Sequence, residues 1–589
     1  MRYFCLITLN LLLFTSIMAQ QPGKIMDADL KENNAKTDVF LKKMYANKFL
    51  NGTLLIAEKG KTVYHNSFGL ANPETGEKLS PNASFRLASV SKQFIGMGIM
   101  ILQEKGKLDY DDNIKKYLPE LLYEDITVRN LLNHTGGLPD YMSLFENNWD
   151  TEKPQEERKT AFNADMVAMF AKKMPEIDFK PGDKYDYSNT GFVLLGEIIE
   201  RASGQPIRDF LQESIFDKAG MTNSQAFSTT DKFSVNNRVY GFSYSADGQS
   251  FKENDWTFLN GMIGDGGIYA SAPDMLKWSN ALTENKLVKR STLEEAYKPV
   301  TLNDGTVSNY GFGWGLNISE EDGHLEGVQH TGGWVGFRTV IVRSFDTERT
   351  FILLTSNSSR QFGDLMRGVA TIWKGGEAVV PNQSVTVKIA ELLAKNVSEE
   401  ELFEQFENLQ RNEADRYDFE ERNINDFGYS YLGEGELDKA IMIFKLNVKN
   451  FPESANAFDS LGEAYLAQAK LNYQKAYQMN PANEGAKNIL EKMGVNTEGL
   501  VKTIVIEDDL LTSYIGKYQL SPDFVFTVRK DGKQLFVQAT GQPEFEVFPL
   551  SENKFYLKAV DAQISFTEDA KSLILHQGGK KQEAARMKN

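Results

Sequence analysis

Cysteine is almost absent from this sequence, and that absence excludes several kinds of chemistry. Only one of the 589 residues is a cysteine, Cys5, and it lies in an N-terminal segment that we expect to be removed. The rest of the chain can form no disulfide bond, no thiolate metal site and no cysteine-based active site. We therefore expect the folded protein to be held together by its hydrophobic core alone.

Histidines, basic runs and one common hydrolase motif are also scarce or missing. The five histidines contain no His-x-x-x-His pair and no adjacent ligand cluster, so we expect neither a metal ion nor another cofactor. Asp and Glu number 81 against 65 Lys and Arg, a net charge of −16, which argues against nucleic acids and anionic lipids as partners. No Gly-x-Ser-x-Gly motif occurs, which argues against a Ser-His-Asp hydrolase of that type.

The N-terminal segment, residues 1–19, has the form of a secretory signal peptide. It has one positive charge, a short apolar stretch and a small residue before Gln20-Gln-Pro22. An uncleaved membrane anchor is the alternative, but polar residues interrupt a stretch that is already near the minimum spanning length. We expect an exported protein, periplasmic or secreted, with no membrane attachment after cleavage.

The length of the chain predicts three or four domains. Residues 35–380 have β-rich runs at both ends and helices between them, which predicts an α+β domain with helices against an antiparallel sheet. Residues 387–495 turn helical, with aromatic, glycine and proline positions at tetratricopeptide spacing and a shortened second repeat. Residues 508–589 form short strands separated by turn residues, the pattern of a small β-barrel.

One stretch of the first domain combines a nucleophile with a base. Ser89 and Lys92 stand three residues apart at the start of an apolar, helix-forming run, and helix positions i and i+3 share a face. A serine needs a group to take its proton, and a lysine can do so if burial lowers its pKa. The same spacing recurs at Ser551 and Lys554 in an expected β-hairpin, so spacing alone is not specific.

A serine nucleophile also needs a proton shuttle and an oxyanion-binding strand. Tyr187-Ser-Asn189 offers a phenol to move protons and an amide to hold the lysine and a substrate carbonyl. His330-Thr331-Gly332-Gly333 opens an expected strand, where two glycines permit close approach of substrate. The tetrapeptide also occurs at His134-Thr-Gly-Gly137, which follows a helix and runs into Leu-Pro, so we interpret that copy as a turn.

The order Ser89-x-x-Lys92, Tyr187-x-Asn189, His330-Thr331-Gly332 resembles the three motifs of the serine β-lactamase and penicillin-binding-protein superfamily, in its class C β-lactamase and D,D-peptidase branch. The resemblance covers the α+β domain, residues 35–380. Leu131–Pro139 and Asp265–Ser271 are also similar to segments of that superfamily, and these segments have no direct catalytic duty.

The resemblance implies a role for each motif. Ser89 attacks a carbonyl to give an acyl-enzyme, and Lys92 and Tyr187 manage protons. Asn189 and the third motif orient the substrate, and the N–H groups of Ser89 and Gly333 form the oxyanion hole. One position departs from the pattern, because the third motif commonly begins with lysine and here begins with His330, as in some D,D-peptidases and D-aminopeptidases. With an ordinary pKa of about 6.5, His330 is expected to be only partly charged at neutral pH, which weakens a carboxylate anchor and β-lactam hydrolysis.

The expected function is that of a secreted serine hydrolase acting through an acyl-enzyme on a peptide, amide or ester. A D-amino-acid peptide is the expected substrate, with activity of the D,D-carboxypeptidase or D-aminopeptidase type. An esterase of the same fold is one alternative. Another is a non-catalytic protein that senses peptidoglycan fragments or β-lactams, with the repeats and barrel binding a protein partner. The intact triplet Ser89, Lys92 and Tyr187 argues against that last alternative.

Overall fold

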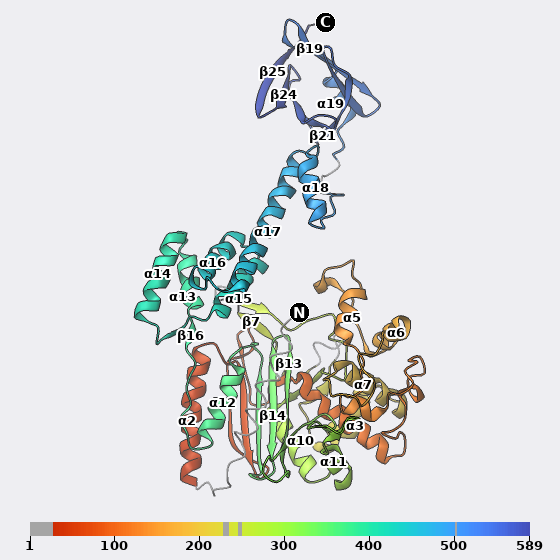
Figure 1. Ribbon diagram of the computed structural model, residues 1–589, viewed down its shortest axis with the longest axis vertical. Helices are drawn as coiled ribbons and strands as arrows, with labels where there is room; N and C mark the ends of the chain where they lie inside the picture. The colour runs from red at the N-terminus through yellow and green to blue at the C-terminus, as the bar shows by residue number, and fades with distance from the viewer. Residues whose placement is uncertain (1–26, 228–234, 245–249, 501–503, 589) are drawn as a thin grey trace. The chain divides into compact units, whose positions relative to one another are not determined.

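The computed structural model describes residues 27–227, 235–244, 250–500 and 504–588, so the expected signal peptide lies outside the described residues. The chain divides into two compact units (Figure 1). The first runs to Gln383 and includes Asp415–Tyr417, and the second holds Ser384–Ala414 and the residues from Asp418 onward.

The first unit is built on a six-stranded sheet whose strands come from both ends of its sequence. They are β1 (Gly52–Glu58), β2 (Lys61–Phe68), β12 (Gly315–Ile318), β13 (Leu325–Trp334), β14 (Phe337–Ser344) and β15 (Arg349–Thr355). Their order in the sheet is β12-β13-β14-β15-β1-β2, and every neighbouring pair is antiparallel. The first strands of the unit therefore pair with its last ones, which brings segments some 300 residues apart into register, such as Leu54 with Leu353.

Each face of this sheet has its own core, because successive side chains of a strand point to opposite faces. Val340 and Val342 of β14 belong to a cluster with side chains of α2 (Asp27–Ala46) and α12 (Phe362–Ile372). Ile341 belongs to the larger cluster on the opposite face. Figure 1 shows α2 and α12 on one side of the sheet and the remaining helices of the unit on the other.

Two helices of the larger face carry residues of the serine site. α3 (Lys92–Glu104) is buried along all but its last two residues, as expected for a helix that is apolar on every side. α7 (Asn189–Ser203) begins after its N-cap Ser188, whose hydroxyl accepts the Gly191 N–H at 3.2 Å. The other helices of this face are α4 (Val128–Leu132), α5 (Tyr141–Asn148), α6 (Asn163–Lys173), α8 (Ile207–Leu211), α9 (Asp217–Ala219), α10 (Ala272–Thr283) and α11 (Arg290–Ala296).

Short elements lie between these helices and at the boundary of the unit. The single helical turns are η1 (Ala88–Ser91), η2 (Ile114–Lys116), η3 (Gln155–Glu157) and the π-helical η4 (Gln212–Phe216). The short strands are β3 (Leu70–Asn72), β4 (Glu77–Lys78), β5 (Ser84–Arg86), β6 (Gln225–Ala226), β7 (Phe242–Tyr244), β8 (Phe251–Glu253), β9 (Ile268–Ser271), β10 (Val300–Thr301), β11 (Val307–Ser308), β16 (Gln383–Ser384) and β17 (Tyr417–Asp418). Of these, β5 is central to the site, because it pairs with β9 and leads directly into η1.

The second unit begins with helices. They are α13 (Thr386–Ala394), α14 (Glu399–Asn412), α15 (Glu421–Gly433), α16 (Leu437–Asn450), α17 (Ala455–Met479) and α18 (Glu484–Lys492). α15 and α16 pack closely, since a Cβ added at Gly428 would lie 2.5 Å from the Phe444 ring. α17 runs unbroken for 25 residues, whereas a regular second repeat would turn between two helices. The tetratricopeptide assignment therefore stays a prediction.

The chain ends in a closed eight-stranded β-barrel that follows α19 (Asp508–Ser513). Its interior is filled by its own cluster of apolar side chains, including Tyr518, Val547 and Leu573. The strands are β18 (Gly516–Ser521), β19 (Phe524–Asp531), β20 (Gln534–Ala539), β21 (Glu544–Ser551), β22 (Lys554–Leu557), β23 (Ala562–Phe566), β24 (Ser572–Gln577) and β25 (Lys580–Arg586). The expected fold class, an α+β domain followed by a helical region and a small β-barrel, is confirmed.

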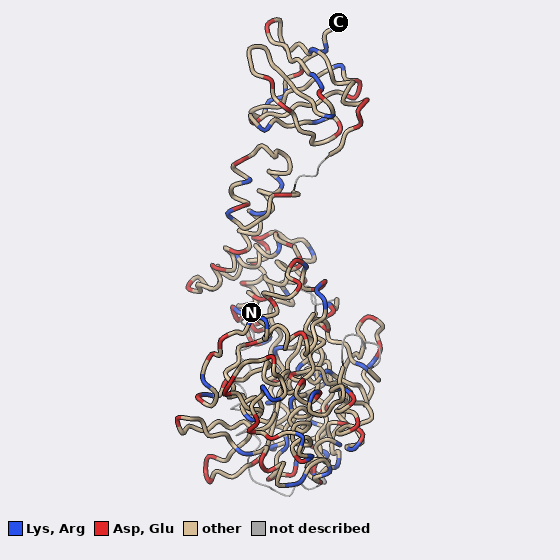
Figure 2. The backbone as a smooth tube through the Cα atoms, turned by 90° about the vertical axis from the view of Figure 1, so that its right-hand side faces the viewer, with Lys and Arg blue, Asp and Glu red and all other residues tan. Residues whose placement is uncertain are grey.

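Charge and hydropathy along the described backbone agree with the composition. Lys and Arg are interspersed with Asp and Glu along both units rather than gathered in one segment (Figure 2). Within the described ranges, no helix is both long enough and apolar enough to span a membrane.

Candidate active site

Ser89 lies in η1, the helical turn between β5 and α3. Its neighbours Ala88 and Val90 are buried, whereas Ser89 itself is partly exposed. Ala88 has a φ of +50°, a left-handed conformation that is uncommon for a residue with a side chain and occurs often at functional sites. The turn thus places one partly exposed serine in an otherwise buried segment.

Lys92, the first residue of α3, is fully buried and its ammonium group meets three oxygens. Its Nζ lies 3.2 Å from Ser89 Oγ, 2.8 Å from Asn189 Oδ1 and 3.0 Å from the Asp265 carbonyl oxygen. Burial lowers the pKa of Lys92 from 10.5 to about 7, and the negative charge of Asp265 opposes that shift. The predicted pairing of Ser89 with Lys92 is therefore present, and Asn189 from a distant helix joins it.

Tyr187 and Asn189 reach the same point from the segment that leads into α7. Lys92 Nζ lies 4.9 Å from the centre of the Tyr187 ring. Burial raises the pKa of the Tyr187 phenol well above its ordinary value, while its hydrogen bond with the Ser89 hydroxyl acts in the opposite direction. At neutral pH the phenol is therefore protonated and can donate.

The third predicted motif lies on β13 at an open edge of the sheet. β12 pairs with β13 only as far as Gln329, so within the described residues no strand covers that side of His330–Trp334. A Cβ added at Gly332 would lie 2.3 Å from the Leu87 carbonyl oxygen and 2.4 Å from Thr339 Oγ1. Only glycine allows β13 to pack this closely on the residue that precedes η1.

His330 is buried, and both of its ring nitrogens are engaged. Nδ1 lies 2.6 Å from the carbonyl oxygen of Thr331, which can only accept, so Nδ1 carries the proton. Nε2 then accepts the hydrogen bond of the Tyr310 hydroxyl at 2.9 Å. Burial and the nearby Lys92 lower the pKa of His330 to about 3. The expectation of a partly charged histidine is therefore wrong, because the site keeps His330 neutral.

The structure also places residues at the site that sequence reasoning did not assign to it. Asp265 supplies the carbonyl oxygen that binds Lys92, and its carboxylate accepts the Tyr141 hydroxyl at 2.9 Å. Burial raises the pKa of Asp265, and the charge of Lys92 opposes this. Tyr310 lies in no recognised motif, and no local pattern marks it. His134 had a signal, the repeated His-Thr-Gly-Gly tetrapeptide, which we interpreted as a turn.

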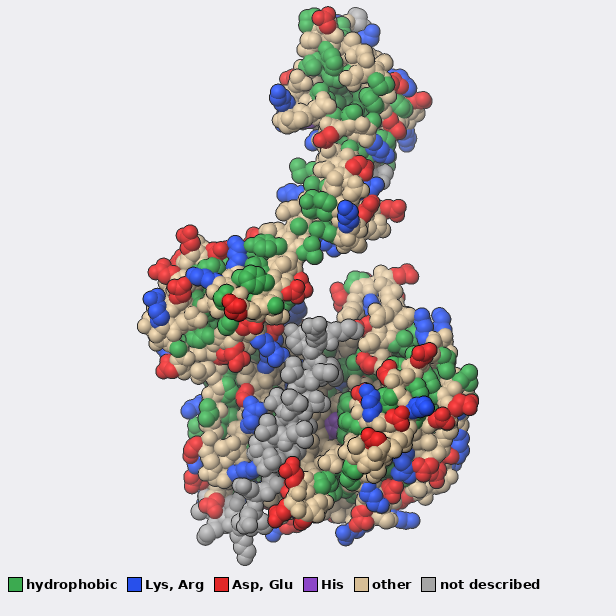
Figure 3. Space-filling model, viewed as in Figure 1, with side chains coloured by type: hydrophobic (Ala, Val, Ile, Leu, Met, Phe, Trp, Pro, Cys, Tyr) green, Lys and Arg blue, Asp and Glu red, His purple; other side chains and the backbone are tan. Residues whose placement is uncertain are grey.

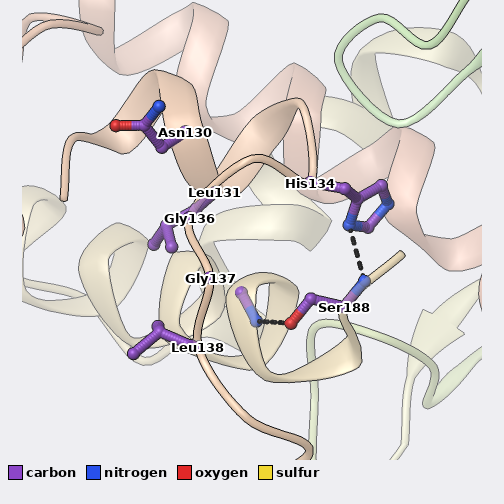
Figure 4. Close-up of a pocket in the computed structure, with 8 residues that line it drawn as sticks. Asn130, Leu131, His134, Gly136, Gly137, Leu138 and Ser188 are labelled. Atoms are coloured by element: carbon purple, nitrogen blue, oxygen red, sulfur yellow. Dashed lines mark hydrogen bonds between the residues drawn. The ribbon is translucent and has the colours of Figure 1, made fainter. Parts of the chain in front are cut away.

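The second Ser-x-x-Lys pair found in the sequence lies on the barrel and has an ordinary structural role. Ser551 and Lys554 face each other across the β21–β22 turn, as the expected hairpin requires. The small pocket in Figure 4 borders the serine site without including its central residues, since its lining contains His134 and Ser188 but not Ser89, Lys92 or Tyr187.

One group of metal-ligand side chains occurs in the described residues, and it is an exposed ion-pair cluster. His324, Glu326 and Asp346 place their polar atoms within 4.8 Å of one another. His324 Nδ1 lies 2.5 Å from Asp322, and His324 Nε2 lies 3.2 Å from Asp346. The hydrogen bonds to these two carboxylates raise the pKa of His324 to about 9, so the imidazole is protonated and forms two ion pairs at neutral pH.

Comparison with known proteins agrees with this geometry. The beta-lactamase family model matches residues 37–370, and a model for a domain of unknown function (DUF3471) matches residues 503–583. Penicillin-binding protein 4* of Bacillus subtilis is 30% identical over 549 residues, which cover 91% of this chain and 95% of that protein. A D-aminopeptidase of Brucella anthropi is 28% identical over 289 residues, 49% of this chain and 52% of that protein.

The solved structures show a likeness of fold. The octameric penicillin-binding protein homologue from Pyrococcus abyssi aligns with a TM-score of 0.50 at 17% identity, covering 95% of this chain and 100% of that chain. The resemblance inferred from the three ordered motifs is confirmed by the family match. The chain therefore belongs to the β-lactamase and penicillin-binding-protein superfamily and is a serine hydrolase of the β-lactamase fold.

Proposed function

We propose that Ser89 is the nucleophile and that Lys92 is its general base. The observation that carries the proposal is the Lys92 ammonium group, which lies 3.2 Å from Ser89 Oγ and whose pKa burial brings to about 7. A base whose pKa lies near the working pH is unprotonated in a large fraction of molecules and is still basic enough to take the serine proton. Because Lys92 is held by Asn189 and Asp265 as well, it is oriented before a substrate arrives.

In the proposed reaction, Ser89 Oγ forms a bond to the substrate carbonyl carbon while its proton passes to Lys92. The tetrahedral oxyanion is stabilised by the N–H groups of Ser89 and Gly333. The bond to the leaving amine or alcohol then breaks, and that group takes a proton through the Tyr187 phenol. Water attacks the acyl-enzyme along the same path in reverse, which releases the acid and restores Ser89.

The state of His330 favours one class of substrate. With Nδ1 bonded to its own main chain and Nε2 bonded to Tyr310, His330 offers neither a positive charge nor a donor to a substrate carboxylate. A carboxypeptidase must bind the terminal carboxylate of its substrate, whereas an amidase or aminopeptidase need not. We therefore favour hydrolysis of D-amino-acid amides and N-terminal D-residues, the substrate type that the name of the D-aminopeptidase relative indicates.

The open edge of β13 supports a peptide-like substrate over a simple ester. An extended backbone can lie along residues 330–334 as an added strand, and main-chain hydrogen bonds then supply affinity without a charged anchor. An esterase of the same fold remains the second candidate, because acyl transfer from Ser89 does not depend on the leaving atom.

The test combines covalent labelling with a substrate panel. A fluorophosphonate probe should label the wild-type protein at Ser89, as located by peptide mapping, and should not label Ser89→Ala. Ser91→Ala is the matched control, because Ser91 is a buried neighbour whose hydroxyl accepts the Ile268 N–H at 3.2 Å. Equal labelling of wild type and Ser89→Ala would contradict the assignment of Ser89 as the nucleophile.

Turnover should then be compared on D-alanine p-nitroanilide, a D-Ala-D-Ala peptide, p-nitrophenyl acetate and a cephalosporin. We expect kcat/KM for the D-anilide to exceed that for the D-Ala-D-Ala peptide by roughly 5- to 150-fold, since a buried unpaired carboxylate costs on the order of 1–3 kcal/mol. A higher kcat/KM for the D-Ala-D-Ala peptide than for the D-anilide would favour a D,D-carboxypeptidase instead.

Export and a protein partner belong to the proposal as well. The supporting observation for export is the signal-like sequence of residues 1–19.

A protein partner for the helical region is supported by its exposed apolar side chains. Phe458, Leu466 and Leu471 of α17 are each more than half exposed. Exposed apolar groups of this kind are typical of interaction surfaces. Hydrophobic side chains at the surface around α17 are visible in Figure 3.

A further inference from the structure

We propose that His134 is a positioning residue for this serine site: its carbonyl group and its imidazole hold the chain on both sides of Tyr187, and its ring packs against the Tyr187 phenol. The inference rests on the proposed function, because it concerns how Tyr187 is kept beside Ser89 and Lys92. It assigns a task to the first His-Thr-Gly-Gly tetrapeptide, which the three-motif mechanism leaves unused.

Two hydrogen bonds to His134 bracket Tyr187. The Asp186 N–H donates to the His134 carbonyl oxygen at 2.9 Å. The Ser188 N–H donates to His134 Nδ1 at 3.0 Å, and Figure 4 shows that nitrogen pointing at the Ser188 main chain. The residues directly before and after Tyr187 are thus held by one residue, and only the second bond depends on its side chain.

The imidazole is suited to this role because it is a permanent acceptor. His134 is 1% exposed, and the N–H that points at Nδ1 requires an unprotonated Nδ1, so the neutral ring carries its proton on Nε2. Burial and the neighbouring Lys92 and His330 hold the pKa of His134 well below its ordinary value. The acceptor for Ser188 is therefore present throughout the pH range in which Lys92 titrates.

The ring also connects the second motif to the third. Its centre lies 4.3 Å from that of Tyr187 and 4.5 Å from that of Tyr310. Tyr310 in turn donates its hydroxyl hydrogen to His330. One imidazole therefore packs between the phenol that moves protons and the phenol that fixes the third-motif histidine.

The backbone of the tetrapeptide is shaped for this contact. His134 has a φ of +59°, and Gly137 has a φ of +72° with space for no side chain, since a Cβ there would lie 2.1 Å from the Phe179 carbonyl oxygen. The Thr135 carbonyl oxygen accepts the Gly182 N–H at 2.9 Å. Residues 134–137 thus form a backbone segment to which the segment that leads to Tyr187 is hydrogen-bonded at Gly182 and Asp186.

The test uses two substitutions that both tolerate the left-handed backbone at position 134. Asparagine and glycine adopt positive φ with little cost. His134→Asn keeps an acceptor atom near the position of Nδ1, whereas His134→Gly removes the acceptor and leaves the Ser188 N–H without a side-chain partner. The two variants therefore differ chiefly in the bond that the proposal invokes.

We expect kcat of His134→Gly on D-alanine p-nitroanilide to fall at least about 30-fold with KM within about twofold, since Tyr187 acts in proton transfer rather than in binding. His134→Asn should retain kcat within about fivefold of wild type. A folded Gly variant with wild-type kcat would overturn the proposal, and so would an Asn variant as impaired as Gly.

A second measurement does not depend on turnover. Hydrogen exchange of the peptide that contains Ser188, followed by mass spectrometry in the full-length protein, should be slow in wild type and His134→Asn and at least about tenfold faster in His134→Gly. Failure of wild type to react with any probe would contradict the proposed function, and the exchange rates would still decide whether His134 holds the Tyr187 segment. Equal exchange in all three proteins would overturn the positioning role.

Discussion

At the scale of single residues, the chemistry depends on one buried lysine. Lys92 is fully buried, and the desolvation of its ammonium group brings its pKa from 10.5 to about 7. The three oxygens around it keep the side chain in place in either protonation state. A group arranged in this way favours reactivity at the expense of stability, because the folded protein must bury a cation or give up a proton.

Lys92→Met should therefore abolish acylation and raise the free energy of unfolding by roughly 1–3 kcal/mol at pH 7. Between pH 7 and pH 10.5 the unfolded chain binds the Lys92 proton more tightly than the folded protein does, so wild-type stability increases with pH in that window. The advantage of the variant should be largest at and below pH 7 and should vanish toward pH 10.5.

Urea denaturation of both proteins at pH 6, 7, 8.5 and 10 measures this difference. Lys115→Met is a suitable control, because Lys115 forms a surface ion pair with Glu124 and its removal should change stability by less than about 1 kcal/mol at any of these pH values. A Lys92→Met protein less stable than wild type at every pH would contradict the expected cost of burying this lysine.

At the scale of elements, the site depends on how closely β13 and β14 pack on the turn that carries Ser89. Thr339 of β14 donates its hydroxyl hydrogen to the Leu87 carbonyl oxygen at 2.6 Å, and Gly332 of β13 leaves no space for a side chain beside the same oxygen. The main chain of β13 and a side chain of β14 therefore both lie directly against the Leu87 carbonyl group, which precedes η1. We therefore expect this contact to control the separation of the two N–H groups proposed for the oxyanion hole.

The two glycines of the third motif should consequently respond differently to substitution. Gly332→Ala places a Cβ 2.3 Å from a carbonyl oxygen, so β13 must move away from η1, and we expect the acylation rate constant to fall at least about 30-fold. Gly333→Ala is the matched control, because the nearest atoms to its added Cβ belong to Arg338 at 3.6 Å or more, and its N–H is retained.

Second-order rate constants for fluorophosphonate labelling of the two variants give the comparison, with circular dichroism to establish folding. We expect Gly333→Ala to stay within about fivefold of wild type. Equal loss in both variants would indicate that the strand tolerates no side chain along this edge, and equal retention would show that the close packing at Gly332 does not control the oxyanion hole.

At the scale of the whole molecule, the proposed chemistry belongs to one unit. Ser89, Lys92, Tyr187 and His330 all lie in the first unit, whose two cores are made of its own residues. The barrel has a separate core, and that core fills its interior. The four residues of the proposed chemistry are therefore held in place by the cores of the first unit.

Separate cores predict separate unfolding transitions in the full-length protein. Differential scanning calorimetry should resolve at least two, and covalent acylation of Ser89 should raise the temperature of one of them only. Ser89→Ala treated with the same reagent should show no shift. A single transition that moves as a whole on acylation would show that the two units unfold cooperatively.

Much of the fold could be predicted from sequence because its signals are local. The β-rich runs at both ends of residues 35–380, the apolar run after Lys92 and the short strands between turns after residue 508 each reflect the period of one element. The order of Ser89-x-x-Lys92, Tyr187-x-Asn189 and His330-Thr331-Gly332 then indicated which residues meet. The tetratricopeptide assignment stays a prediction, because α17 continues as one helix where a regular second repeat would turn.

The sequence by itself determined which chemical groups this protein has and the order in which they occur along the chain, since an i, i+3 pair and a strand-opening glycine pair are local features. Tertiary structure decided what those groups can do. Burial from many directions brings the pKa of Lys92 to about 7, burial and the nearby Lys92 keep His330 neutral, and His134 lies against Tyr187. These properties depend on contacts between residues that are distant in the chain, and a pattern read along one segment does not contain them.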